Sequence, residues 1–128
     1  MSAHRTPPLP TGAELAILGV LWTRGPSTVR DVRAALGRDT AYTTALKLLQ
    51  IMHAKGLVSR EKASRTHVYA AAETPERTQR RLADDLADRA FGGSAARLAL
   101  RALASQPARG AELARVRALL ERLDREGA

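Results

Sequence analysis

Residues 57–72, LVSREKASRTHVYAAA, contain two short runs of strand-favouring residues on either side of a small polar turn. The runs are Val58–Lys62 and Thr66–Ala70, and the turn is Ala63–Arg65. Valine, threonine and tyrosine favour extended backbone, and two such runs joined by a short turn predict an antiparallel hairpin. A lone hairpin is marginally stable in water, so this one has to pack against other elements.

The residues before the hairpin predict three helices. The first lies within residues 11–26, TGAELAILGVLWTRGP, and opens with a capping box formed by Thr11 and Glu14. The second lies within residues 27–37, STVRDVRAALG, and the third runs from about Thr40 to Lys55. Three helices followed by a hairpin is the order of a winged helix-turn-helix, so the sequence predicts this mainly α fold.

The predicted third helix has two different faces. Apolar residues at helical spacing form a stripe that is expected to face the core; they are Ala45, Leu48, Leu49 and Met52. The opposite face holds short uncharged residues and one lysine; it comprises Thr43, Lys47, Gln50 and Ala54, with Thr44 beside it and Thr40 at the expected cap. A routine solvent face would mix glutamate with lysine to support the helix, yet this one contains no acid.

A helix that enters the major groove of DNA needs such a face. Threonine can hydrogen-bond a phosphate or a base edge, and Lys47 can reach a guanine or a phosphate. Free N–H groups near Thr40 at the helix start add a phosphate site. The alternative is that Thr40 only caps the helix while Thr43 and Thr44 are idle, but the missing acids favour DNA contact. Tyr42 lies between the faces, where its hydroxyl meets phosphate or its ring only packs.

The hairpin carries three basic residues, Arg60, Lys62 and Arg65. An arginine at the tip of a wing can enter a minor groove or clamp a phosphate. The alternative is a charged edge that keeps the hairpin from pairing with other strands. We favour DNA contact for Arg65. For Arg60 and Lys62 both interpretations are open, and Arg60 is kept as a candidate for DNA contact.

The charge of the chain is unevenly distributed. The 128 residues carry a net charge of +8, from 21 Lys and Arg against 13 Asp and Glu. Residues 1–69 hold 10 basic and 4 acidic residues, whereas residues 70–128 hold 11 and 9. A GC-rich genome can make a protein basic through composition alone, but the concentration of charge in the first half favours a nucleic-acid partner.

Other functions lack the residues that they need. No cysteine is present, which excludes disulfides, thiol catalysis and cysteine-ligated metal. His4, His53 and His67 are too widely separated for metal-ligand spacing or a triad, so we predict no enzyme activity, no metal and no cofactor. No apolar run approaches the ~20 residues that span a bilayer, and residues 1–8 lack the apolar core of a signal peptide. We expect a disordered lead-in and a cytoplasmic protein without membrane insertion.

The second half predicts further helices separated at Gly92–Gly93 and at residues 106–110, QPARG. The last helix carries apolar residues at spacings of three, four and three, the a/d seam of a coiled coil; they are Leu113, Val116, Leu120 and Leu123. The seam either folds back on its own domain or pairs with a second copy. Because this half has too few bulky residues for an independent core, we favour a homodimer, with Leu98 and Leu103 as further dimerisation candidates.

Four stretches carry specific motifs: LPTGAELAILGVLWTRGPSTVRDVRAAL, AYTTALKLLQIMHAKGLVSRE, SRTHVYAAA and LADRAFGGSAARLAL. Through them the chain resembles, from about Leu9 to Leu123, the BlaI/MecI/CopY family of penicillinase-repressor-type regulators. The resemblance implies a homodimeric winged-helix repressor that binds a palindromic operator in double-stranded DNA. It also implies that AYTTALKLLQ is the recognition helix, that REKASRTHVY is the wing, and that the C-terminal helices make the dimer.

Two departures from the family pattern concern induction. In the β-lactam-responsive members, induction proceeds by proteolysis at an Asn-Phe bond, and the resemblance implies a membrane-embedded metallopeptidase sensor as the source of the signal. The matching stretch here, LALRALASQ, has Arg101-Ala102 at that place. The copper-responsive members use a cysteine-rich C-terminal site, which this cysteine-free chain excludes.

The sequence therefore predicts a DNA-binding transcriptional repressor. Its expected parts are a lead-in over residues 1–8, a winged-helix DNA-binding domain over 9–72 and a helical dimerisation domain over 73–128. Two alternatives are a winged-helix module that binds another protein instead of specific DNA, and a regulator gated by a small molecule.

Overall fold

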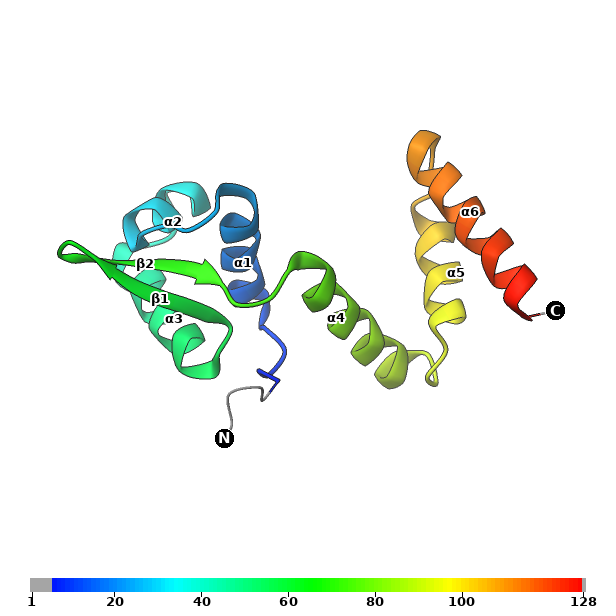
Figure 1. Cartoon of the computed structure of the whole chain (residues 1–128), viewed down its shortest axis with the longest axis horizontal. Helices are drawn as coiled ribbons and strands as arrows, with labels where there is room; N and C mark the ends of the chain where they lie inside the picture. Colours follow the sequence, from blue (N-terminus) through cyan, green and yellow to red (C-terminus); the bar gives the residue numbers. More distant parts are fainter. Residues whose placement is uncertain (1–5, 128) are drawn as a thin grey trace. The chain divides into compact units, whose positions relative to one another are not determined.

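The computed structural model describes residues 6–127. Its contacts divide the chain into two compact units, one ending at Leu82 and one starting at Ala83. The elements in chain order (Figure 1) are α1 (Gly12–Arg24), α2 (Val29–Leu36), α3 (Tyr42–Lys55), β1 (Val58–Ala63), β2 (Thr66–Ala71), α4 (Pro75–Ala90), α5 (Ala95–Ser105) and α6 (Gly110–Gly127). Three helices followed by a two-stranded antiparallel sheet confirm the predicted winged helix-turn-helix.

The first two helices begin where their side chains satisfy free backbone groups. Thr11 and Glu14 form the predicted capping box of α1, in which the Thr11 hydroxyl accepts from the Glu14 N–H at 3.2 Å. Thr28 and Asp31 form a second box at the start of α2. The Thr28 N–H donates to the Asp31 carboxylate at 3.1 Å, and the Thr28 hydroxyl accepts from the Asp31 N–H at 3.1 Å. Because the hydrogen bond from the Thr28 N–H favours the charged carboxylate, the pKa of Asp31 lies below its ordinary value.

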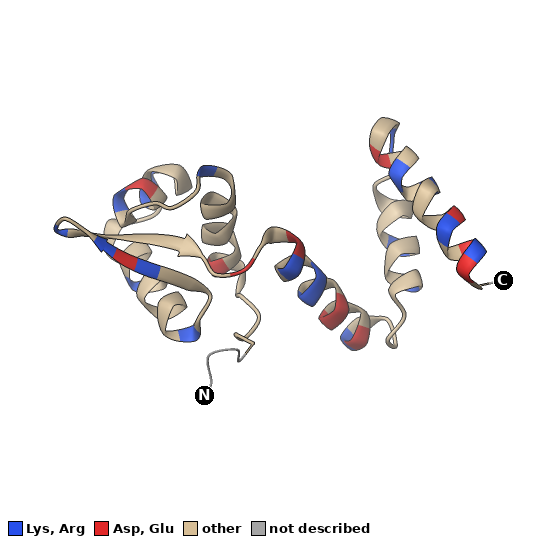
Figure 2. Cartoon of the chain, in the orientation of Figure 1, with Lys and Arg blue, Asp and Glu red and all other residues tan. Residues whose placement is uncertain are grey.

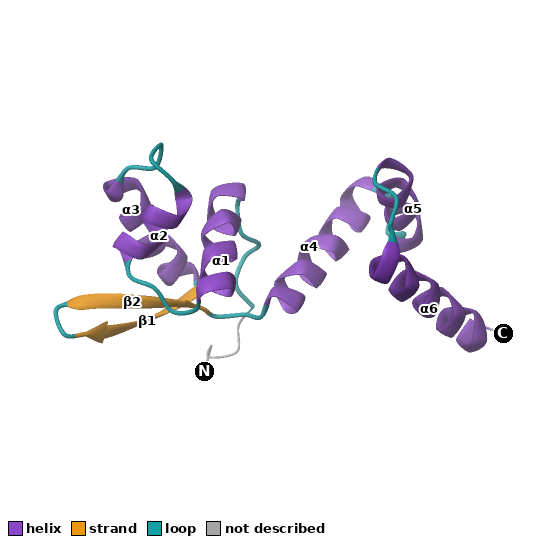
Figure 3. Cartoon of the chain, turned by 90° about the horizontal axis from the view of Figure 1, so that it is seen from above, coloured by secondary structure: helices purple, strands orange, loops and turns teal. Residues whose placement is uncertain are grey.

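The hairpin packs against the helices through Tyr69. The backbone N–H of Tyr69 donates to the Ser27 carbonyl at 2.8 Å, and the Ser27 N–H donates back to Tyr69 at 2.9 Å. The Tyr69 side chain is buried in the same core as Ile17 from α1 and as Leu49 and Met52 from α3. Figure 3 shows the three helices on one side of the two strands. The hairpin is thus stabilised by the helices, as its marginal intrinsic stability requires.

The strands pair in the register Val58↔Ala71 to Ala63↔Thr66, and each is one residue longer than predicted. The turn between them consists of Ser64 and Arg65. Ser64 has φ 57°, a left-handed conformation that glycine adopts more easily than serine.

The second unit is helical and has little buried surface. Helices α5 and α6 bury none of their residues, and large apolar side chains remain exposed on them. The predicted boundary between residues 72 and 73 lies before the division at Leu82, and α4 begins in one unit and ends in the other. Among the described residues, no helix is both long and apolar enough to cross a membrane.

The predicted lead-in lies partly outside the described residues, because residues 1–5 are not described. Its described end belongs to the first unit and contacts α4 there. The Pro7 carbonyl accepts a hydrogen bond from Arg81 at 2.8 Å.

Candidate nucleic-acid interface

The predicted recognition helix, α3, begins later than the sequence indicated. Its N-cap is Ala41, so the prediction that Thr40 caps the helix is wrong. The methyl side chain of Ala41 cannot accept a hydrogen bond. Thr40 is held in the preceding turn instead, because its N–H donates to the Gly37 carbonyl at 3.3 Å and its carbonyl accepts from Arg33 Nε at 3.0 Å. None of the described side chains caps α3, so its first N–H groups remain available to an anion.

The two faces of α3 differ as predicted. Ala45, Leu49 and Met52 are fully buried, while Leu48 is half-buried against the same core. The opposite side is exposed; it comprises Tyr42, Thr43, Thr44, Lys47 and Gln50. Because Tyr42 is 50% exposed, its ring is not part of the core. The helix therefore presents hydroxyl groups and one ammonium to solvent, with no carboxylate among them.

The hairpin presents positive charge beside this helix in the same unit. Arg60, Lys62 and Arg65 are all exposed, and Figure 2 shows basic segments along β1 and at the turn. Arg60 and Lys62 lie on one face of β1, and Glu61 lies on the other, because successive side chains alternate. Arg65 is the second residue of the turn, at the tip of the hairpin.

An ion pair fixes the far end of α3. Lys55 Nζ lies 2.8 Å from the Glu14 carboxylate, which is 2% exposed. Burial alone would raise the pKa of Glu14, but the hydrogen bonds from Lys55 and from the Thr11 N–H outweigh it and hold that pKa below its ordinary value. The pair ties the start of α1 to the last turn of α3.

Sequence reasoning missed both Arg33 and the Glu14–Lys55 pair. Neither has a local signal, because each contact joins residues that the chain brings together only on folding. The capping box predicted that the Glu14 carboxylate would accept from the Thr11 N–H, which it does through Oε1. It did not predict that Oε2 would accept from Lys55.

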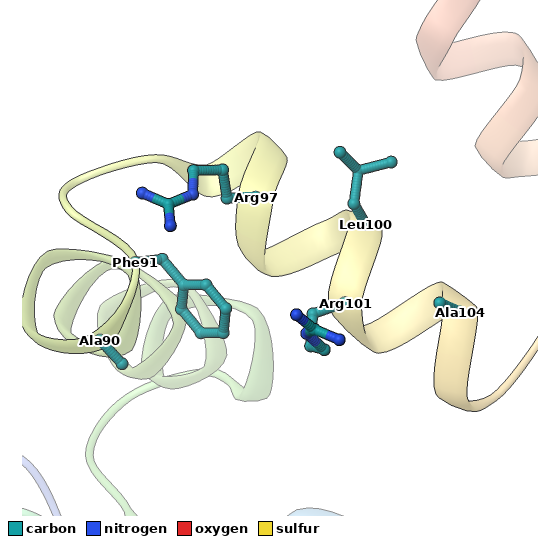
Figure 4. Close-up of a pocket in the computed structure, with 6 residues that line it drawn as sticks. All are labelled: Ala90, Phe91, Arg97, Leu100, Arg101 and Ala104. Carbon is teal, nitrogen blue, oxygen red and sulfur yellow. The ribbon is translucent and has the colours of Figure 1, made fainter.

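The dimerisation candidates of the second unit are partly or fully accessible. Leu98, Leu113 and Val116 are half-buried, whereas Leu103, Leu120 and Leu123 are exposed. A hollow between the end of α4 and α5 is lined by Phe91 and Leu100 together with two arginines (Figure 4); the full lining is Ala90, Phe91, Arg97, Leu100, Arg101 and Ala104. Among the described residues, no group of three His, Cys, Asp or Glu side chains could hold a metal ion.

A three-helix unit with a hairpin wing places the chain in the class of winged helix-turn-helix proteins. Within this class the sequence matches the family described as "Penicillinase repressor" over residues 10–122, so the chain belongs to the penicillinase repressor (BlaI/MecI) family. Membership confirms the resemblance inferred from the motifs. Because this is a family of transcriptional repressors, it also confirms that the chain is not an enzyme.

Similar curated proteins include the transcriptional regulator BlaI of two Mycobacterium tuberculosis strains, CDC 1551 / Oshkosh and ATCC 25618 / H37Rv. Each is 45% identical over an alignment of 60 positions, which covers 44% of this chain. The chain spans 44% of the length of these relatives.

Similar solved structures include two regulators. A transcriptional regulator from Thermotoga maritima superposes with a TM-score of 0.50 at 15% identity, over 89% of this chain and 73% of that one, and so shares the fold. The homodimeric winged helix-turn-helix DNA-binding domain (fragment 1–100) of a possible ArsR-family regulator from Mycobacterium bovis has a TM-score of 0.46 at 28% identity, over 65% of this chain and 74% of that one.

Proposed function

We propose that this protein is a transcriptional repressor that binds a palindromic DNA operator as a homodimer. The observation that supports DNA contact most directly is the exposed, acid-free face of α3 with a basic hairpin in the same unit. The contact residues proposed are Thr40, Tyr42, Thr43, Thr44, Lys47, Arg60 and Arg65. Since the genome is the proposed partner, the proposed location is the cytoplasm.

The hydroxyls and the ammonium of α3 suit the major groove. Thr43 and Thr44 can donate to base edges or phosphates, and Lys47 can donate to guanine. The uncapped N–H groups at the start of α3 can bind a phosphate at the edge of the groove. Arg65 at the hairpin tip can clamp the backbone or enter the adjacent minor groove.

The homodimer is supported by the apolar surface of the second unit. Leu120 and Leu123 are 58% and 49% exposed, and burying one leucine contributes roughly 1.5–3 kcal/mol. Because α5 and α6 leave these leucines exposed, pairing with a second copy would supply this energy. A two-fold dimer would present its recognition helices to half-sites about 34–36 Å apart, which is why the proposed operator is palindromic.

The source of the inducing signal is part of the proposal. The family resemblance points to a membrane-embedded metallopeptidase sensor acting on the C-terminal helices. At the matching place, Arg101 and Ala102 lie inside α5 and are exposed. Incubation of the purified repressor with that sensor, followed by mass spectrometry, would show whether the bond between them is cut.

A genome-wide binding map would identify the operator, and a gel-shift titration on that DNA tests the recognition helix. The double variant Thr44→Ala, Lys47→Ala should lose sequence-specific binding. A matched control is Thr23→Ala, Arg24→Ala, which removes one exposed threonine and one positive charge at the end of α1. Specific binding that survives in the first variant would refute the assignment of α3, and affinity that ignores sequence in the wild type would favour a protein-interaction module.

A further inference from the structure

Arg81 joins the lead-in of the chain to the start of α4. Its Nη1 donates to the Pro7 carbonyl at 2.8 Å, and its Nη2 donates to Glu73 Oε1 at 3.0 Å. The side chain is 19% exposed, so both bonds are largely shielded from water. Arg81 thus connects three segments of the first unit that are separate in sequence: the lead-in, the link after β2, and the second turn of α4.

Glu73 is itself held from two sides. Its carboxylate is 11% exposed and also accepts from Arg77 Nε at 3.0 Å. Its backbone carbonyl accepts the indole N–H of Trp22, in α1, at 3.0 Å. The Thr78 hydroxyl lies 3.4 Å from the same carboxylate oxygen that Arg81 binds. The first turns of α4 are therefore tied to α1 through a single acidic residue.

This arrangement is not explained by stability alone. A shielded ion pair loses much of its attraction to desolvation, and apolar side chains of similar size often serve as well. Arg81 Nε is moreover buried and has no hydrogen-bond partner within residues 6–127, which is a further cost. The guanidinium can fix the orientation of the segments that it joins, because its planar fork binds two acceptors only in one orientation.

We propose that Arg81 is a positioning residue for operator binding, which holds the first two turns of α4 in one orientation on the winged-helix unit. The inference rests on the proposed homodimer. α4 is continuous from Pro75 to Ala90, so the orientation of its start determines how the helix leaves this unit. In a homodimer, the separation of the two recognition helices then depends on Arg81.

The consequence concerns binding to a complete operator. After one recognition helix has bound, the second binds at an effective concentration that depends on how firmly its position is held. Loss of Arg81 should therefore weaken binding to the palindrome much more than binding to an isolated half-site. A residue that only stabilised the fold would weaken both equally.

The absence of cysteine allows a direct measurement. Ala35→Cys places one spin label on the exposed surface of α2, and pulsed electron paramagnetic resonance then gives the distance between the two labels of a dimer. We expect a narrow distribution of label-to-label distances when Arg81 is present and a clearly broader distribution in Arg81→Met. The control is Arg80→Met, an exposed neighbour in the same helix, which should leave the distribution narrow. Arg81→Lys, which keeps the charge but not the fork, should restore only part of the narrowing.

Gel shifts on palindrome and half-site complete the test. Arg81→Met should lose about tenfold or more in affinity for the palindrome and less than about twofold for the half-site. An unchanged distance distribution, or equal losses on both DNAs, would overturn the positioning role. Circular dichroism confirms that the variants are folded, and Arg81→Gln, which keeps two donors, serves if Arg81→Met does not fold.

One readout does not require a dimer. Hydrogen exchange of the α4 amides over residues 79–82 should be faster in Arg81→Met than in Arg80→Met, and equal exchange would also overturn the inference. If the wild type gives no dipolar signal at all, the homodimer proposal fails, whereas the exchange experiment still decides whether Arg81 orders α4.

Discussion

At the scale of single residues, the charges of this protein have different tasks. Lys47 is exposed on the acid-free face of α3, where a cation is available for contact with DNA. Lys55, two turns further along the same helix, pairs with the buried Glu14 and fixes the helix to α1. The two lysines belong to one element, but burial of the partner makes one structural and leaves the other available for binding.

The role of Lys47 can be measured through salt dependence. If Lys47 contacts a base, Lys47→Ala should weaken specific binding by roughly 1–3 kcal/mol and relax specificity at one position. If it contacts phosphate, the variant should bind all DNA sequences more weakly to the same extent, and the slope of log affinity against log salt concentration should fall in magnitude by about one. Titrations at several salt concentrations, on operator and random DNA, separate the two. No change in either quantity would remove Lys47 from the interface.

The Glu14–Lys55 pair should make stability depend on pH. Folding lowers the pKa of Glu14 below its ordinary value of 4.5. The pair therefore contributes its full stabilising free energy above pH 4.5, and this contribution is lost as the pH falls through the lower pKa of the folded state. Lys55→Met should cost about 1–3 kcal/mol at pH 7, since Glu14 would stay buried without its partner, and less at pH 3. Urea denaturation at both pH values measures this, with Lys62→Met as an exposed control. An equal loss at both values would contradict the prediction.

At the scale of elements, the hairpin shows how a weak unit becomes a usable wing. In the part of the chain that the structure describes, its two strands pair only with each other, apart from the Ser27–Tyr69 bridge just before α2. Tyr69 fills the core from β2, while the residues of β1 after Val58 are exposed. One end of the hairpin is therefore stabilised by burial, and the other end projects its charges into solvent.

The turn of the hairpin offers a test at this scale. Ser64 adopts φ 57°, which costs a residue with a Cβ about 1 kcal/mol relative to glycine. Ser64→Gly should therefore raise the free energy of unfolding by roughly 0.5–1 kcal/mol, whereas Ser64→Ala should not raise it. Chemical denaturation of both variants gives the comparison. A gain with alanine equal to the gain with glycine would show that the conformation of residue 64 is not the cause.

At the scale of the whole molecule, the two units differ in how they are stabilised. The first has a continuous core that includes Ile17, Leu49 and Tyr69. The second leaves leucines exposed on α5 and α6, whose burial in a homodimer would supply the missing core. Dimerisation and folding of the second unit are then expected to be linked, so its apparent stability should rise with protein concentration.

The dimer can be tested by placing charge on the apolar seam. Leu120→Glu, Leu123→Glu should convert a dimer into a monomer, because two carboxylates would lose their hydration at the interface. Sedimentation at micromolar concentration measures the change. Ala118→Glu, on the outer side of the same helix, is the control and should remain dimeric. A monomeric wild type would disprove the homodimer itself.

Much of this protein follows from local sequence signals. The period of apolar residues, the capping box at Thr11 and the strand-favouring runs around Ser64 predicted every helix and strand of the first unit to within a few residues. The apolar and polar faces of α3 were predicted as well, because a helical period of 3.6 residues decides which side chains share a face. These features depend on neighbours in sequence. The sequence also places most of the net positive charge, +6 of +8, in residues 1–69.

Only the tertiary structure decided the contacts between distant segments. Thr40 was predicted to cap α3, but the cap is Ala41. Thr40 lies in the preceding turn, where its carbonyl accepts from Arg33 and its N–H donates to Gly37. Arg81 reaches Pro7 across 74 positions of sequence, and Lys55 reaches Glu14 across 41. Such hydrogen bonds leave no periodic or compositional trace, because the partners of a buried polar group are chosen by the packing of the core and not by the residues beside it in the chain.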